Sequence, residues 1–179
     1  MKENIKFTIL FPCVVLVMAT LYVVLHEMGH AIVAIACGAS ITQFSVANAH
    51  MSYTGGHFTQ ITTSLLNASG MLFPVLTFAL SLLFFKKDKN NLLHRCCYFA
   101  ACLWGIGPLL AWVVVPIIAL LSASPAGDDV TKFMMNSGWH PGVVALLSGL
   151  LLICLITFIF FKGIPQSFKA MLKSFQPEG

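Results

Sequence analysis

The sequence contains few charged residues. Of its 179 residues, 9% are Asp, Glu, Lys or Arg, whereas 58% are hydrophobic. Soluble globular domains carry about 25% charged residues, and the mean hydropathy of this chain is +0.89. The composition therefore excludes an ordinary soluble protein and is typical of a small polytopic membrane protein. We expect one integral membrane domain over residues 1–179, without a separate soluble domain.

Two other signatures are missing from the sequence. None of the six cysteines belongs to a C-x-x-C pair, so we expect neither a zinc ribbon nor a disulfide framework, and we interpret the cysteines as small core residues. The net charge of +4 comes from Lys and Arg residues at the ends of apolar segments. Because no basic face with interleaved aromatic residues is present, we expect no nucleic-acid partner.

The most informative motif is H-E-x-x-H at residues 26–30, within an apolar stretch over 7–37. At about 3.6 residues per turn, His26 and His30 lie on one helical face and can bind a single zinc ion, with Glu27 beside the open coordination site as a general base. An uncompensated charge near the middle of a membrane helix costs about 2.5–3.5 kcal/mol. A divalent cation offsets this cost, which favours a metal site over a chance match or two structural histidines.

Four apolar segments are long enough to cross a bilayer core of about 30 Å. They cover residues 6–37, 61–85, 92–121 (or 96–121) and 142–161. After the first segment, residues 41–46 and 50–54 have the pattern of two short strands, with a turn at Gly55-Gly56. We therefore expect an all-α polytopic membrane protein with about four transmembrane helices and a strand-like hairpin after the first.

The distribution of Lys and Arg predicts the orientation in the cell membrane. Lys2, Lys6, the loop over 86–95 and the Lys-bearing tail fall on one side, whereas the loop after Gly38 has no Lys or Arg and the loop after residue 121 has only Lys132. By the positive-inside rule both termini are cytoplasmic. The apolar run continues into the motif without a polar break, which favours an uncleaved first span over a signal peptide. The motif and the loop over 122–141 are then both expected on the non-cytoplasmic side of the membrane.

A catalytic zinc ion usually has three protein ligands, so a third must come from elsewhere in the chain. The acidic residues are Glu3, Glu27, Asp88, Asp128, Asp129 and Glu178. The terminal residues and the aspartate of the opposite basic loop are excluded by position, which leaves Asp128 and Asp129. Residues 125–130 have the pattern of a helix start in which Asp128 is a natural N-cap, so we favour Asp129 as the ligand.

Three histidines on the predicted side of the motif are alternative ligands. They are His50, His57 and His140. Histidines in loops are more often exposed than bound to metal, so we rank them below the two aspartates. His57 and His140 are also candidates for stabilising an oxyanion, with a structural role favoured for both.

Together these residues resemble the site-2 protease family of intramembrane zinc metalloproteases, in particular its small members related to bacterial sporulation-factor processing proteases. The resemblance covers residues 26–31, the break at Gly38, the strand-like segment, residues 68–70 and the later aspartate. It implies one zinc ion per chain bound by the two motif histidines and an aspartate, with the motif glutamate as base. It also implies substrates that are membrane-embedded helices.

Two positions depart from the family pattern. Family members commonly have Asp-Gly at the third ligand and Gly-Pro with a nearby Asn in the preceding span, whereas here Asp129 precedes Val130 and the span reads Asn67-Ala68-Ser69-Gly70. Asn67 is therefore either an oxyanion-stabilising group or the donor of a helix–helix hydrogen bond.

The sequence predicts a zinc-dependent intramembrane endopeptidase in the lipid bilayer, in which Glu27 activates water. A substrate helix would enter laterally, unwind and pair with the edge of residues 41–54. The alternative is a non-proteolytic metal-binding membrane protein, either a pseudoprotease adaptor or a metal-handling transporter. An intact Glu27 disfavours the adaptor, and the lack of an inverted repeat disfavours the transporter. The substrate, the oligomeric state and any accessory gating protein stay open.

Overall fold

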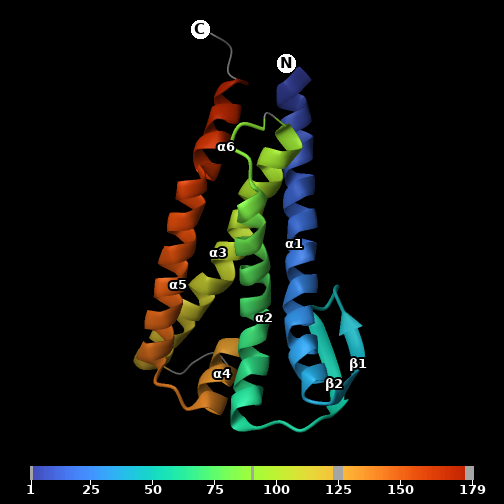
Figure 1. Ribbon diagram of the computed structural model, residues 1–179, viewed down its shortest axis with the longest axis vertical. Helices are drawn as coiled ribbons and strands as arrows, with labels where there is room; N and C mark the ends of the chain where they lie inside the picture. The colour runs from blue at the N-terminus through green and yellow to red at the C-terminus, as the bar shows by residue number, and fades with distance from the viewer. Residues whose placement is uncertain (1, 90, 123–126, 176–179) are drawn as a thin grey trace.

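Four long helices form the body of the protein. The computed structural model describes residues 2–89, 91–122 and 127–175 (Figure 1). The long helices are α1 (Lys2–Ala36), α2 (Gln60–Ser81), α3 (Leu92–Leu121) and α5 (Pro141–Lys162), and a short 3-10 turn, η1 (Leu82–Phe84), extends α2. Each of the four is long and apolar enough to cross a membrane. The prediction of about four spanning helices is confirmed.

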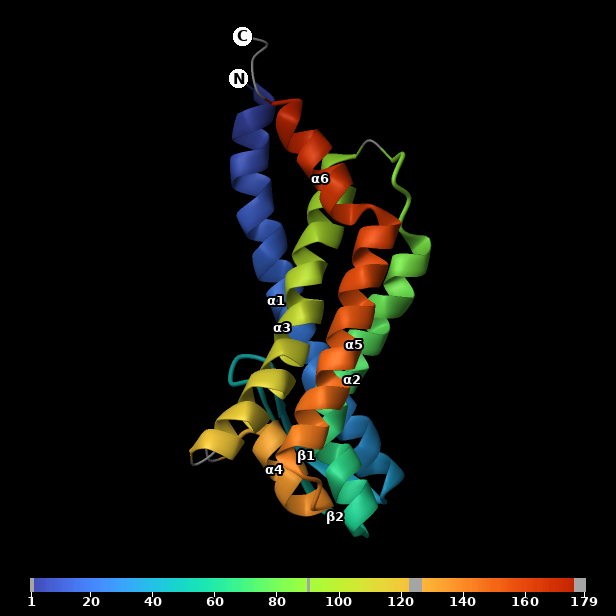
Figure 2. The ribbon, with the colours of Figure 1, turned by 90° about the vertical axis from the view of Figure 1, so that its left-hand side faces the viewer.

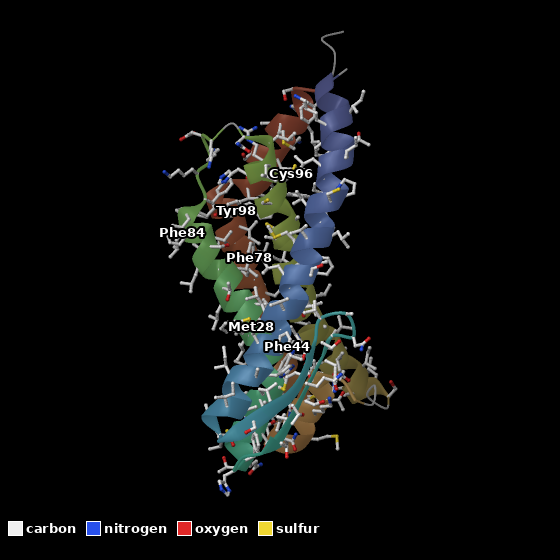
Figure 3. The ribbon with its side chains drawn as sticks, turned by 90° about the vertical axis from the view of Figure 1, so that its right-hand side faces the viewer. Met28, Phe44, Phe78, Phe84, Cys96 and Tyr98 are labelled. Carbon is white, nitrogen blue, oxygen red and sulfur yellow. The ribbon has the colours of Figure 1, made fainter. Side chains whose placement is uncertain are left out.

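A two-stranded antiparallel hairpin follows α1, as predicted. It consists of β1 (Ala39–Ser45) and β2 (His50–Gly55), which pair from Ala39 opposite Gly55 to Ser45 opposite His50. Gly38 lies between α1 and β1 with φ +81°, a left-handed conformation that ends a helix without strain only at glycine. The predicted turn at Gly55-Gly56 is not the tip of the hairpin but the exit from β2 towards α2. Figures 1 and 3 show the hairpin alongside the last turns of α1.

Two short helices complete the fold, and only one of them was expected. The helix predicted near residue 128 is α4 (Asp129–Ser137), although residues 125 and 126 of its predicted start lie outside the described residues. The predicted basic tail instead contains α6 (Ile164–Lys173), whose Ile164, Phe168 and Met171 are buried. This spacing of i, i+4 and i+7 is that of an amphipathic helix, and it was the signal in the sequence for α6.

The core lies around α2 and α3. The main cluster of buried residues joins α2, α3, α4 and α5, for example through Phe78, Leu109, Val130 and Leu155. In contrast, α1 exposes large apolar side chains such as Leu16, which is 69% exposed. In a bilayer such side chains contact lipid, so α1 is peripheral and α2 is central. Figure 2 shows the four long helices side by side, with α4 at the end of the bundle that holds the hairpin.

All six cysteines are free, as expected from their spacing. The expectation that they are core residues is right for Cys96 and Cys102, which are buried, and wrong for Cys13 and Cys154, which are exposed. The two exposed thiols lie on spanning helices, α1 and α5, where an apolar side chain is tolerated on the lipid-facing surface.

Candidate metal centre

The H-E-x-x-H motif lies on the part of α1 that packs against α2. Glu27 is buried, with 4% of its surface exposed, whereas the rings of His26 and His30 are partly buried. Two glycines allow the close approach of these helices. A Cβ atom on Gly29 would collide with the main-chain oxygen of Ser69, and one on Gly70 would collide with both imidazole rings. The site is therefore built into a tight contact between two helices.

Three ligand atoms converge at this contact. Asp129, the first residue of α4, places Oδ2 3.1 Å from His26 Nε2 and 3.1 Å from His30 Nε2. The two Nε2 atoms are 3.2 Å apart. In the part of the chain that the structure describes, these residues form the one group of His, Cys, Asp or Glu side chains suited to hold a metal ion.

The second nitrogen of each imidazole is also occupied. His30 Nδ1 lies 2.7 Å from the carbonyl oxygen of Leu66 on α2, and His26 Nδ1 lies 3.3 Å from the Tyr22 hydroxyl one turn earlier on α1. A carbonyl can only accept, so a neutral His30 ring carries its proton on Nδ1 and presents the lone pair of Nε2 to the other two ligand atoms. Such outer contacts orient metal-binding histidines.

The donor set fits a zinc ion. Without a cation, a neutral His30 would direct its Nε2 lone pair at the carboxylate oxygen of Asp129, and this contact between two acceptors is unfavourable in a partly buried site. A tetrahedral zinc ion with ligand distances of about 2.0–2.1 Å holds its donors about 3.3 Å apart. The observed separations of 3.1–3.2 Å are close to this value. Two imidazoles and one carboxylate are a common catalytic zinc set.

The comparison with protein families gives a match over nearly the whole chain. The model of the Peptidase M50B-like family matches residues 5–173. The chain belongs to the Peptidase M50B-like family. Comparisons with curated proteins and with solved structures gave no significant match. The family match confirms the resemblance to site-2 proteases, and with the four apolar helices it indicates a multi-pass membrane protein of a peptidase family.

In this M50B-like chain the two candidate aspartates have different environments. Asp128 caps α4: its Oδ1 accepts the N–H of Thr131 at 2.9 Å and its Oδ2 accepts the Thr131 hydroxyl at 2.7 Å. Burial favours the neutral acid of Asp129, but hydrogen bonds that His26 and His30 donate when their Nε2 atoms carry a proton outweigh burial and lower the pKa of the Asp129 carboxyl below its usual range. Asp129 is thus a carboxylate at neutral pH, the form that binds metal.

The other candidate residues do not join the ligand group. His50 pairs with Ser52 Oγ at 2.8 Å, and His140 caps α5 by accepting the N–H of Gly142 at 3.1 Å. His57 is exposed. Asn67 is buried on α2, and its Nδ2 has no hydrogen-bond partner within the described residues. The side chains of Glu3 and Glu178 lie outside the described part of the chain.

Sequence reasoning gave three residues of the centre no role there. Tyr22 lies four residues before His26, and this spacing was a usable signal because residues i and i+4 share a helical face. Leu66 acts only through its carbonyl oxygen, which contacts His30 Nδ1. Gly70 matters because a side chain at this position would collide with the two imidazole rings. Gly70 belongs to the segment 68–70 on which the family resemblance partly rests, but the resemblance gives it no role, and the roles of both residues depend on how α1 packs against α2.

Proposed function

We propose that the protein is a zinc-dependent intramembrane endopeptidase that hydrolyses peptide bonds of membrane-embedded protein substrates. The observation that carries the proposal is the convergence of His26 Nε2, His30 Nε2 and Asp129 Oδ2 within 3.2 Å of one another. Glu27, next to His26 in the chain, is buried and is not part of that ligand group. The arrangement provides three metal ligands and one spare carboxylate, as metal-assisted hydrolysis requires.

In the proposed mechanism His26, His30 and Asp129 hold the metal and Glu27 moves the proton. A zinc ion bound there would supply an acidic water molecule and would polarise the scissile carbonyl. Glu27 takes the proton from that water and passes it to the leaving amine when the peptide bond breaks. Within the described residues no Lys, Arg or His side chain forms an ion pair with Glu27, so its carboxylate is not held in a salt bridge.

The hairpin supports a role in binding an extended substrate. A peptide bond inside a helix is shielded from attack, so a transmembrane substrate must unwind near the scissile bond. The sheet has only two strands, so each strand keeps one edge without a strand partner in the described residues. The hairpin lies beside the turns of α1 that carry the motif (Figure 3). An unwound segment could add to one of these edges through main-chain hydrogen bonds.

The test combines zinc content with proteolysis. The purified protein in lipid nanodiscs is analysed for bound zinc and for cleavage of a panel of labelled single-span membrane peptides. We expect one zinc per chain in the wild type and in Glu27→Gln, with cleavage only in the wild type. Glu178→Gln, the same change near the C-terminus, is the matched control and should cleave normally.

Two results would contradict the proposal. Cleavage by Glu27→Gln would remove Glu27 from the role of base. A wild-type protein that binds zinc but cleaves none of the peptides would favour the non-proteolytic alternative.

A further inference from the structure

An apolar pocket of about 290 Å³ lies between α1, α2 and α3, next to the metal centre. On α1 its wall includes Tyr22, one helical turn before His26, and on α2 it includes Pro74, one turn after Gly70. One turn of an α-helix is about 5.4 Å long. The pocket thus lies about one helical turn from the candidate metal centre, along the same two helices, α1 and α2. Figure 3 labels two of its residues, Phe78 and Tyr98, between α1 and α2.

Three of the polar side chains in the pocket wall are already bonded to main-chain carbonyl groups. Thr77 donates to the carbonyl oxygen of Phe73 at 2.8 Å, Ser81 to that of Phe78 at 2.7 Å and Tyr98 to that of Ser81 at 3.0 Å. The surface offered to an occupant is therefore almost entirely apolar. Such a surface selects its occupant by size and hydrophobicity rather than by charge.

One unpartnered polar group in the pocket wall favours a peptide as the occupant. Trp104, in the pocket wall, has a buried Nε1 without a hydrogen-bond partner among the described residues, so it can donate to a carbonyl group. An occupant that brings a carbonyl group together with an apolar side chain, as a peptide does, would give this donor a partner.

We propose that this pocket binds a bulky apolar side chain of the substrate, leucine-like or aromatic, next to the scissile bond. This inference rests on the proposed function and extends it to substrate preference. A cavity of about 150 Å³ is enough to hold benzene, so 290 Å³ accommodates one large side chain with room to spare. The tyrosine ring that lines the pocket also contacts His26, so the filled pocket lies beside the reacting centre.

The experiment uses peptide hydroxamates, which bind zinc directly and do not depend on the identity of the natural substrate. Three compounds differ only in one side chain, which is methyl, isobutyl or benzyl. Their dissociation constants are measured for zinc-loaded full-length protein in phosphatidylcholine nanodiscs. Each methylene buried in an apolar site strengthens binding about fourfold. We expect the wild type to bind the isobutyl and benzyl compounds on the order of 10- to 50-fold more tightly than the methyl compound.

Filling the pocket should remove this preference. Ala101 lies in the pocket wall on α3, and Ala101→Phe places a ring in the space that the side chain would occupy. We expect the ratio of dissociation constants to fall below about threefold, with zinc content and methyl-hydroxamate affinity unchanged. Ala101→Leu should give an intermediate ratio, which separates pocket filling from misfolding. Ala111→Phe, on the exposed face of the same helix, is the matched control and should keep the wild-type ratio.

Each other outcome overturns the proposal in a distinguishable way. If all three hydroxamates bind equally to the wild type, or if Ala101→Phe keeps the preference, the pocket does not select the side chain while the proposed function stands. If Ala101→Phe keeps the preference and loses co-purified phospholipid, the pocket holds a lipid acyl chain. If the zinc-loaded wild type does not bind even the methyl compound, the proposed function and the pocket both fail.

Discussion

The contact between Tyr22 and His26 allows a sharp test of how the metal centre is held. Tyr22→Phe removes only the hydroxyl group that lies 3.3 Å from His26 Nδ1. The ring itself should stay in place, because it stacks on Trp104 with centroids 5.8 Å apart and planes at 21°. With zinc on Nε2, Nδ1–H of His26 donates to the tyrosine oxygen, so the substitution leaves that donor without its partner.

The expected magnitude follows from the geometry. Loss of an outer hydrogen bond to a metal-binding histidine usually weakens metal affinity by about 10- to 100-fold. A separation of 3.3 Å is at the long end for hydrogen bonds, so the lower end of that range applies. We expect the zinc dissociation constant to rise about tenfold, which corresponds to about 1.4 kcal/mol.

The assay is competition for zinc between the purified protein and a chelating dye, at fixed pH. Tyr98→Phe is the matched control: it removes a hydroxyl of the same pocket, which donates to the carbonyl oxygen of Ser81 at 3.0 Å. The control should bind zinc like the wild type. The reasoning is refuted if Tyr22→Phe stays within twofold of the wild type, or if Tyr98→Phe weakens zinc binding equally.

Two further predictions concern the packing and the third ligand. Gly70→Ala places a methyl group against both imidazoles, so we expect loss of bound zinc and destabilisation of the fold by about 1–3 kcal/mol. Zinc content and thermal unfolding measure these two effects. Gly107→Ala is the control and should show neither effect, because a Cβ atom at Gly107 has nothing within 4 Å. Asp129→Ala should abolish stoichiometric zinc, whereas Asp128→Ala should keep it and lower stability by about 1 kcal/mol through loss of the cap of α4. Equal zinc content in the two aspartate variants would contradict this assignment.

Local rules account for much of what the sequence predicted. The four spanning helices follow from the length of the apolar runs, and the common face of His26 and His30 follows from helical periodicity. The preference for Asp129 over Asp128 came from a capping rule that involves only neighbouring residues, and Asp128 does cap α4. The helix α6 was missed although its apolar spacing was local, because the basic residues were interpreted only as a topological signal.

The sequence alone thus determined the spanning helices, the hairpin, the paired imidazoles and a short list of possible third ligands, because each depends on residues a few positions apart. The tertiary structure decided which carboxylate meets the imidazoles, since α4 must pack against α2 to bring Asp129 to His30 across 99 positions of sequence. It also decided the roles of the Leu66 carbonyl and of Gly70, and it created the apolar pocket between three helices. These features depend on the distances between helices, which are set by the packing of side chains from distant segments.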